Sequence, residues 1–450
     1  MAALLPLSLF FTGATALAGL LRGAYAAQAA SLVAGVALLL ASVAGYALAD
    51  GAGGLGALLA VLTGVVTLAA LLAEWGGIRR GGAFYPCLVL LLAGCLYYLF
   101  GAGDLLSFYI GFELVLVPRV LVIGIWGSGA ARIRAAFLFF LYTLVGSLAR
   151  LACLVALWWG EPGPLLTGAP VAGLTGPASL ALASGFALAF AVKTPLLPFH
   201  TWLFRAHAQA PVGGSVLLAG LVLKLSAWGI ALVFLSWFPA AWAALLPAVL
   251  ALASVSLVYS SLSAMRQTDL KAVVAISSVG HRALSVRGLA LAGGAGWTGG
   301  ILLQFAHGLV SPALFVLVGG VLYERYHTLL AVYYRGLSVL LPGFALLFLF
   351  ASLANCATPP SLNWLSELLA IAGVLGASPL AALAAASSVL LGAGYTVWVF
   401  TRASYGEWGP ALQPLGDAGR RHTALALVLV GLAGVAGPAS THLLDSLWAH

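Results

Sequence analysis

The chain is apolar and weakly charged for its size. Of its 450 residues, 63% are hydrophobic and 7% are charged, against about 25% charged residues in soluble domains. This composition excludes a soluble fold. The formal net charge of +8 would suggest a nucleic-acid partner in a soluble protein. Here many of the arginines fall in short loops between apolar stretches, where they set membrane topology through the positive-inside bias.

Apolar stretches follow one another along the chain. Each has about twenty residues, the length that spans a hydrocarbon core as a helix, and we count about fourteen of them between polar or Gly/Pro-rich breaks. The strands of a β-barrel would alternate in units of about ten residues, so helices are predicted throughout. The predicted fold class is all-α, a polytopic membrane protein. Residues 1–100 supply the first spans, and the later ones carry ionisable residues in the order Glu113, Lys193, Lys224, His281, His307 and Glu367.

Four of these ionisable residues are acids or lysines inside apolar runs: Glu113, Lys193, Lys224 and Glu367. Each charge costs about 2.5–3.5 kcal/mol at the centre of a bilayer. Together they would cost on the order of 10 kcal/mol, as much as the whole stability of a typical domain. They must therefore be paired, hydrated or functional.

The use of lysine favours a functional role. Only three of the nineteen basic residues are lysines, and two of them, Lys193 and Lys224, lie in apolar helices. A buried lysine can gain and lose a proton, whereas arginine stays charged. The pattern favours proton transfer, and static salt bridges that fix helix register are the alternative.

Prolines lie next to two of the buried charges. Residues 195–198 hold two prolines just after Lys193, and the pair Pro359–Pro360 precedes Glu367. Proline removes a backbone donor and clashes one turn back, so both helices are predicted to break. Broken helices with ionisable residues in two halves of a transporter are typical of inverted repeats with ion sites at the breaks. The halves share no clear sequence identity, so the repeat is a hypothesis.

Two histidines, His281 and His307, lie between Lys224 and Glu367 in the sequence. Neutral imidazole both donates and accepts hydrogen bonds and titrates near neutrality, which suits a proton relay. A hydrogen bond in a helix interface would explain either histidine alone equally well, but the neighbouring lysines favour the relay. Three further histidines are expected at the membrane interface: His200, His207 and His327.

No metal or cofactor site is predicted. The four cysteines lie in or beside apolar helices without CxxC spacing, which gives no support for zinc or iron–sulfur ligation. Residues 51–56 match the pattern GxGxxG, and Glu74 follows near the expected offset of about twenty residues. That fingerprint functions only inside a βαβ unit, so we interpret the match as a coincidence at a glycine-rich helix junction.

Several stretches resemble the subunit 4 family of NADH dehydrogenase, an antiporter-like membrane subunit of mitochondrial respiratory complex I. GDLLSFYIGFEL at 103–114 resembles the family's glutamate helix, and AVKTPLLPFHTWL at 191–203 resembles its broken lysine helix. APVGGSVLLAGLVLKL at 210–225 is similar to the helix of the central lysine. RQTDLK, SSVGH, YERYHT, YRGL, LANCATPPSLNWLSEL and SYGEWG follow in the family's order. The resemblance covers residues 97 to 408 and depends on this order and spacing.

The resemblance implies a fold of fourteen transmembrane helices with two inverted five-helix repeats and two broken helices. It divides the chain into N-terminal helices (1–100), a first repeat (101–236), a second repeat (237–401) and a C-terminal loop and helix (402–450). It also implies a proton route. On that route Glu113 pairs with Lys193, Lys224 is the central carrier, His281 and His307 pass the proton on, and Glu367 faces the outlet.

The implied function is that of a proton-translocating subunit of NADH:ubiquinone oxidoreductase, an enzyme through its complex and without a redox site of its own. The implied location is the mitochondrial inner membrane. NADH, flavin, iron–sulfur clusters and ubiquinone would bind partner subunits. The expected partners are other membrane-arm subunits, neighbouring antiporter-like subunits among them, and the lipid bilayer, with no nucleic acid. Two alternatives stay open: a sodium/proton antiporter subunit outside complex I, and a scaffold whose charges only fix packing.

Three arginines depart from the family pattern. Arg119, Arg150 and Arg282 stand where the family usually has uncharged residues, and each adds a buried or near-interface cation. Arg119 lies six residues after Glu113, so we expect it to compete with Lys193 for that carboxylate.

Overall fold

The computed structural model describes residues 4–48, 54–78, 81–160, 176–235, 237–407, 412–413 and 416–439. Within these ranges the regular elements are helices, and one isolated β-bridge joins Asp269 to Leu330. Packing separates the chain into two compact units, Met1–Trp202 with Leu221–Leu250 and Leu203–Gly220 with Ala251–His450. Helices α10 (Thr201–Gln209) and α13 (Pro239–Met265) carry the chain from one unit into the other.

The helices have the length and composition of membrane spans. Nine helical segments of the described ranges are long and apolar enough to cross a membrane, and four shorter apolar helices accompany them. The prediction of an all-α polytopic membrane protein is confirmed. The division at residues 100, 236 and 401 stays a prediction, because the two units are defined by packing and not by internal repeats.

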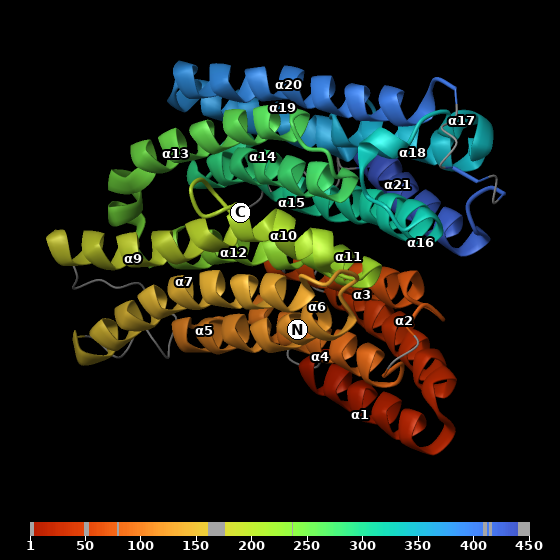
Figure 1. The fold of residues 1–450 in the computed structure, drawn as a ribbon. Helices are drawn as coiled ribbons and strands as arrows, with labels where there is room; N and C mark the ends of the chain where they lie inside the picture. The colour runs from red at the N-terminus through yellow and green to blue at the C-terminus, as the bar shows by residue number, and fades with distance from the viewer. Residues whose placement is uncertain are drawn as a thin grey trace. The chain divides into compact units, whose positions relative to one another are not determined.

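The first unit begins with a group of four mutually packed helices. Helix α1 packs against α2 and α4, and α3 packs against the same two helices, which gives the red-to-orange group in Figure 1. Helix α7 then packs against α6, which precedes it in the chain, and against α9, which follows it. The elements of this unit are α1 (Leu4–Arg22), α2 (Ala24–Leu48), α3 (Gly54–Ala73), α4 (Phe84–Phe100), α5 (Leu105–Leu114), α6 (Leu116–Trp126), α7 (Arg132–Gly160), α9 (Pro177–Lys193), η1 (Val222–Lys224), α12 (Leu225–Gly229) and η2 (Ile230–Leu235).

The glycine-rich match at residues 51–56 lies at the junction of α2 and α3. Helix α2 ends at Leu48, and α3 begins at Gly54, inside the match. Residues 51–53 themselves lie outside the described ranges.

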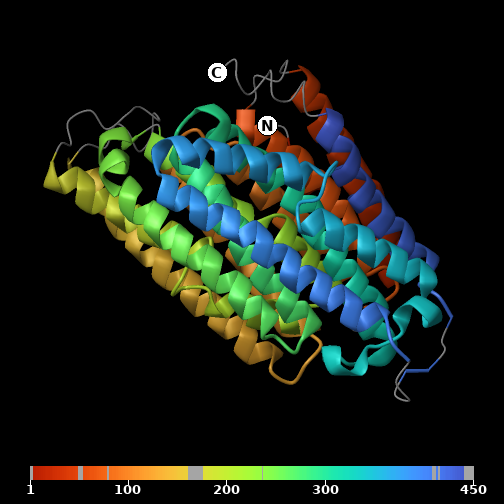
Figure 2. The same ribbon diagram turned by 90° about the horizontal axis from the view of Figure 1, so that it is seen from above.

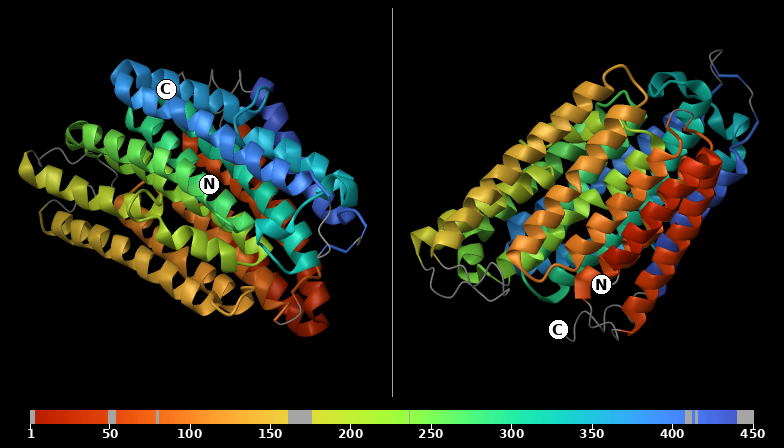
Figure 3. Two further views of the ribbon diagram at one scale, coloured as in Figure 1. Left: turned by 45° about the horizontal axis from the view of Figure 1, so that its top comes forward. Right: turned by 90° about the horizontal axis from the view of Figure 1, so that it is seen from below.

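The second unit is organised around α15, whose side chains are buried along most of its length. Helix α15 packs against α14, α19 and α21, and α19 lies beside α20 (Figures 2 and 3). The elements of this unit are α11 (Val212–Gly220), α14 (Leu270–Ala290), α15 (Gly294–Phe315), η3 (Val316–Tyr323), α16 (Glu324–Tyr326), η4 (Ala331–Tyr333), α17 (Leu337–Leu340), α18 (Pro342–Asn355), α19 (Leu362–Ala377), α20 (Pro379–Ser404) and α21 (Arg420–Ala439).

Both predicted helix breaks are present. Helix α9 ends at Lys193 and α10 begins at Thr201, and the carbonyl of Val192 beside the break accepts a hydrogen bond from the Trp202 indole at 3.1 Å. Helix α18 ends at Asn355 and α19 begins at Leu362. A broken helix leaves carbonyls and amides without their usual partners, and such groups need other partners in a membrane.

Side chains meet that need at the second break. The hydroxyl of Thr358 donates to the Leu353 carbonyl at 3.0 Å. The Ser361 hydroxyl accepts from the amide of Trp364 at 3.3 Å and so caps the start of α19. The break is therefore stabilised locally, and it places the first turns of α19, with Glu367, inside the second unit.

We predict that Gly299→Ala weakens the second unit. Gly299 lies on α15 where α19 approaches it, and a Cβ added there would lie 2.7 Å from the Ser366 carbonyl oxygen and 2.8 Å from the Leu369 carbonyl carbon. Backbone atoms cannot rotate away, so overpacking should cost about 1–3 kcal/mol. The measurement is the amount of assembled subunit after mild heating. Gly376→Ala on α19, where a Cβ meets open space, is the matched control, and equal losses in the two variants would contradict the prediction.

Candidate functional site

The predicted site residues fall into two groups, one in each unit. Glu113, Lys193 and Lys224 belong to the first unit, and His281, His307 and Glu367 belong to the second. The side chains of both lysines and of His307 and Glu367 are buried. Within each unit the neighbouring charges can be identified from the described contacts.

The carboxylate of Glu113 is paired with Arg150. The Arg150 guanidinium donates to Glu113 Oε1 at 2.7 Å, and the Ser147 hydroxyl donates to the same oxygen at 2.5 Å. Arg150 and Ser147 lie three residues apart on α7, so both donors face the end of α5 from one side of the helix. The Arg150 side chain is fully buried, whereas that of Glu113 is 27% exposed.

Aromatic rings of α5 surround the guanidinium of Arg150. Its central carbon lies 3.8 Å from the centroid of the Phe112 ring, 5.1 Å from that of Tyr109 and 5.5 Å from that of Phe108. A guanidinium within about 6 Å of a ring face is attracted by the ring quadrupole. The rings therefore stabilise a cation whose Nε and Nη1 atoms have no hydrogen-bond partner among the described residues.

Lys193 joins this group through the rings and not through Glu113. Its Nζ atom lies 4.8 Å from the centroid of Phe112 and 5.5 Å from that of Phe139, and it forms no ion pair with Glu113 in the described residues. The expected pair of Glu113 and Lys193 is thus replaced in this state by the Glu113–Arg150 pair. The physical reason is that Arg150 and Ser147, on one face of α7, both donate to the Glu113 carboxylate.

Arg119 does not take the partner expected for it. Its Nε atom donates to the Val115 carbonyl at 2.9 Å, one turn earlier on its own segment, and its guanidinium lies 5.6 Å from the Phe139 centroid. The competition for Glu113 expected of Arg119 comes from Arg150 instead. One carboxylate and three cations, Arg119, Arg150 and Lys193, share this part of the first unit.

Lys224 lies where the backbone leaves regular α-helix. It ends the short 3₁₀ segment η1 between α11 and α12, and a π-helical segment, η2, follows. Its side chain is fully buried. Helix α12, which follows Lys224 directly, packs against α9, the helix that ends at Lys193. Irregular turns of this kind are frequent at functional sites.

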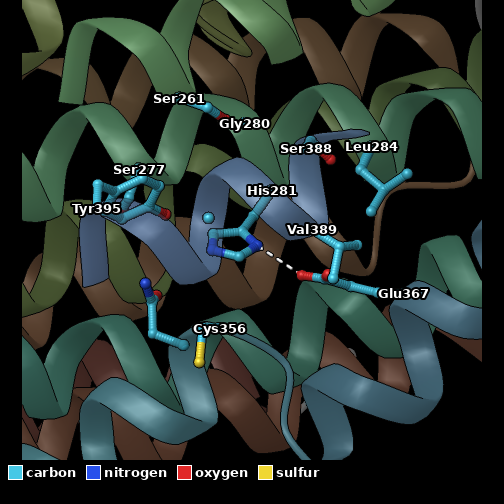
Figure 4. Close-up of a pocket in the computed structure, with 12 residues that line it drawn as sticks. Ser261, Ser277, Gly280, His281, Leu284, Cys356, Glu367, Ser388, Val389 and Tyr395 are labelled. Atoms are coloured by element: carbon cyan, nitrogen blue, oxygen red, sulfur yellow. Dashed lines mark hydrogen bonds and ion pairs between the residues drawn. The ribbon is translucent and has the colours of Figure 1, made fainter. Parts of the chain in front are cut away.

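His281 and Glu367 form the central contact of the second unit. His281 Nδ1 lies 2.8 Å from Glu367 Oε1, and the two side chains are 11% and 7% exposed. Figure 4 shows the imidazole pointing at the carboxylate, with Ser388, Val389 and Tyr395 of α20 around them. These two residues, which the family resemblance implies lie on one proton route, are in direct contact, and their role on that route stays a prediction.

A small cavity adjoins this contact. His281, Glu367, Ser277, Asn355 and Tyr395 are among its lining residues, and it offers about 20 Å³ to the centres of water molecules. That volume is enough for about one water molecule. His281 Nε2 has no hydrogen-bond partner among the described residues.

His307 lies beside His281 but has different partners. The two ring centroids are 5.4 Å apart. His307 Nε2 lies 3.0 Å from the Ser278 hydroxyl, and its Nδ1 lies 3.2 Å from a guanidinium nitrogen of Arg282. Two histidines that look alike in the sequence thus occupy different environments, one beside a carboxylate and one beside a cation.

One buried titratable residue, Lys271, was not expected from the sequence. Lys271 follows the capping residue Asp269 near the start of α14 and is 1% exposed; its ammonium donates to the Ala210 carbonyl at 3.3 Å and lies 5.2 Å from the Tyr323 ring. Burial raises the pKa of Asp269, and the Ala272 amide and the charge of Lys271 oppose that rise. In the sequence Lys271 lies only two residues after the cap Asp269, at a polar break, and this position did not indicate that the start of α14 is buried inside the second unit.

His207, expected at the membrane interface, is buried inside the second unit, and its depth in the membrane stays a prediction. Its side chain is fully buried and stacks on Phe315, with ring centroids 4.4 Å apart and planes inclined by 6°. Both ring nitrogens lack a hydrogen-bond partner among the described residues. The break before α10 suggested a surface position, but α10 enters the second unit, whose α15 supplies the ring.

The chemistry of these groups is acid–base chemistry. Lysine, histidine and glutamate side chains exchange protons, and the described residues contain no group of three or more His, Cys, Asp or Glu side chains that could hold a metal ion. The free cysteines, buried or partly buried, are dispersed over the fold.

A protein-family model matches more than half of the chain. Residues 102–392 match the family model described as NADH:quinone oxidoreductase/Mrp antiporter, transmembrane. The chain belongs to this family. Among family relatives, NADH-ubiquinone oxidoreductase chain 4 of Mycosarcoma maydis is 40% identical over 399 residues, which cover 89% of this chain and 82% of that protein.

Solved structures of the family share the fold over the full chain. A chain of respiratory complex I from Thermus thermophilus, solved with bound NADH, matches with a TM-score of 0.83 and 29% identity over 99% of this chain and 98% of that one. A chain of the Mrp complex from Dietzia sp. matches with a TM-score of 0.85 and 20% identity over 100% and 97% of the two chains. The second match shows the fold alone, so the fold does not separate the two branches of the family.

We predict that Glu113→Gln weakens the assembled subunit more than Arg150→Met does. The first change leaves a fully buried guanidinium without a counter-charge, whereas the second leaves a carboxylate that is 27% exposed and bonded to Ser147. Removing one partner of a buried ion pair costs about 3–5 kcal/mol, and exposure reduces that cost for Glu113. The measurement is the temperature at which the subunit dissociates, followed on native gels.

The double variant Glu113→Gln/Arg150→Met should recover most of the loss, because the unpaired cation is gone. Arg402→Gln, at an exposed arginine of α20, controls for loss of a positive charge. Equal losses in the two single variants, or additive losses in the double variant, would show that the pair does not carry the stabilisation.

Proposed function

We propose that this chain is the chain 4 subunit of mitochondrial NADH:ubiquinone oxidoreductase, complex I, and that it moves protons across the inner membrane. The observation that carries the proposal is the 40% identity to a chain of that name over 89% of this chain. The buried acid–base groups described above give such a subunit the means to carry protons through an apolar interior.

The redox chemistry belongs to other subunits in this proposal. NADH, flavin, iron–sulfur clusters and ubiquinone bind partner subunits, and this chain acts in the enzyme as a translocase component. The lack of CxxC spacing among its cysteines supports this assignment. Its partners are the neighbouring membrane-arm subunits, other antiporter-like chains among them.

The first unit supplies the group that responds to its neighbours. Glu113 is the acid near three cations, and only Lys193 among those cations can release a proton, because arginine stays charged. A change in the hold of Arg150 on Glu113 would alter the field at Lys193, since both cations lie against the ring of Phe112. We therefore assign Glu113 and Lys193 to the step that couples this subunit to the rest of the complex.

Lys224 is the central carrier in the proposed route. It is fully buried and ends a short 3₁₀ segment between α11 and α12. A desolvated lysine can change its protonation state without a large movement. The order of steps, from Lys193 to Lys224 and on to the second unit, is the one that the family resemblance implies.

The second unit supplies the outlet. Glu367 accepts a hydrogen bond from His281 Nδ1, and His281 Nε2 has no hydrogen-bond partner among the described residues beside a cavity with room for about one water. A water molecule in that cavity that receives a proton from the route can pass one on to His281 Nε2, and His281 can give its Nδ1 proton to Glu367. One proton enters the imidazole and one leaves, so the ring ends neutral in its other tautomer and the carboxylate ends protonated.

We predict that Lys224→Met abolishes NADH-driven proton pumping while the complex remains assembled, because methionine fills the site without a titratable group. Lys224→Arg should also abolish pumping, since arginine keeps the charge but does not release its proton. Pumping is measured with NADH in sealed vesicles, and assembly is measured on native gels. A scaffold role predicts the opposite for arginine, namely normal pumping wherever the charge is kept.

Sodium dependence separates the two branches of the family. If the chain belongs to complex I, pumping by the wild-type complex should be unchanged when sodium is replaced by potassium. A pumping rate that follows the sodium concentration, in a preparation without NADH oxidation, would assign the chain to a sodium/proton antiporter instead. Co-purification with NADH-oxidising subunits provides the independent check.

A further inference from the structure

Arg282 occupies the position next to His281 but faces another helix. Consecutive helical residues point about 100° apart, so they do not share a face. On α14, His281 is directed to Glu367 of α19, and the Arg282 guanidinium is directed to Gln304 and His307 of α15. Arg282 is 1% exposed and was noted in the sequence only as an unusual cation.

A chain of side-chain hydrogen bonds holds the guanidinium in place. Arg282 donates to the Gln304 side-chain oxygen, and the Gln304 amide donates to the Ser285 hydroxyl. The Ser285 hydroxyl in turn donates to the Gly300 carbonyl at 2.8 Å. These bonds run between α14 and α15 and do not involve His281 or Glu367. The position of the guanidinium is thus set independently of the outlet.

The guanidinium determines which nitrogen of His307 carries a proton. Arginine has hydrogen-bond donors and no acceptor, so His307 Nδ1, at 3.2 Å, must accept. A neutral imidazole with an accepting Nδ1 carries its one proton on Nε2. There it donates to the Ser278 hydroxyl at 3.0 Å, and that hydroxyl donates to the Val274 carbonyl at 3.1 Å. The two contacts of His307 are consistent with one tautomer.

The same contact opposes a second proton on His307. An imidazolium would point an N–H group at the N–H groups of Arg282 and would place two cations side by side in a buried site. Among the described residues, the His281 ring lies beside His307 with centroids 5.4 Å apart, and Glu367 on α19 is bonded to His281. His307 therefore has no lone pair to offer while Arg282 holds Nδ1.

We propose that Arg282 is a positioning residue that keeps the proton route closed at His307. A proton crosses this link only when the guanidinium withdraws from Nδ1. The arriving proton then binds Nδ1, and the Nε2 proton passes to the Ser278 hydroxyl, which gives up its own proton toward the Ser311 hydroxyl 3.4 Å away, so that one proton enters the imidazole and one leaves. His281 has no such block, since its Nε2 has no hydrogen-bond partner among the described residues and the residue lines the cavity. The inference rests on the proposed function, because it assumes that protons pass His307.

The test measures proton leak without NADH. The complete complex is reconstituted into sealed vesicles, a pH gradient is imposed by an acid pulse, and the internal pH is followed with a dye. Arg282→Met has a similar length but no donor and no charge, so Nδ1 becomes available and the leak should rise several-fold. Arg282→Lys retains a donor without an acceptor and should leak like the wild type. Assembly of each variant is confirmed on native gels.

A double variant separates a proton route from a packing defect. In Arg282→Met/His307→Phe the ring nitrogens are gone, so the leak should return to the wild-type value. A leak that persists in the double variant would overturn the proposal, because it would not pass through His307. An unchanged leak in Arg282→Met would overturn it as well. If that variant fails to assemble, Arg282→Leu, which also has neither a donor nor a charge, takes its place with the same expectation of a higher leak.

The proposed function is tested separately in the same vesicles. NADH-driven pumping by the wild-type complex reports on the assignment to complex I, whereas the leak comparison uses no NADH. Absent pumping with a leak that depends on Arg282 and His307 would reject the assignment and keep the closed link. Normal pumping with equal leaks in all variants would keep the assignment to complex I and reject the proposal that Arg282 closes the route at His307.

Discussion

The cost of an ion in an apolar interior is the constraint on which this structure depends. Water is absent from most of the bilayer core, so a buried charge needs a counter-ion, a ring face or a hydrogen-bond partner. The described arginines and lysines of the interior meet that need in different ways. Arg150 pairs with Glu113, Lys193 lies against Phe112, and Arg282 bonds Gln304. The helices are packed so that each of these buried cations lies next to its partner.

Helix breaks and irregular turns place these groups where regular helices could not. The break after Lys193 and the break before Glu367 end two helices inside their units, and the 3₁₀ turn at Lys224 interrupts a third segment. Each irregularity frees backbone groups that must find partners, as the Trp202 indole does for the Val192 carbonyl. A transporter needs such points, because a proton carrier fixed in a continuous helix face has fewer ways to exchange partners.

The two units use cations for different purposes. In the first unit Arg150 competes with Lys193 for one carboxylate, so the charge balance around Glu113 can shift when a neighbour moves. In the second unit Arg282 faces a histidine and selects its tautomer. Glu367 bonds His281 and not Arg282. A fixed cation can thus set the field at one acid–base group or block the lone pair of another.

The sequence by itself determined the fold class and the helix breaks, and it indicated several of the buried titratable residues, because hydrophobic length, proline chemistry and the cost of buried charge act locally. It also gave the family, through ordered motifs. Only the tertiary structure decided the partners. Arg150 lies 37 residues from Glu113 and Gln304 lies 22 from Arg282, and no local pattern encodes such contacts. The burial of His207 and Lys271 likewise depends on which helices meet, since both lie beside breaks that read as surface in the sequence.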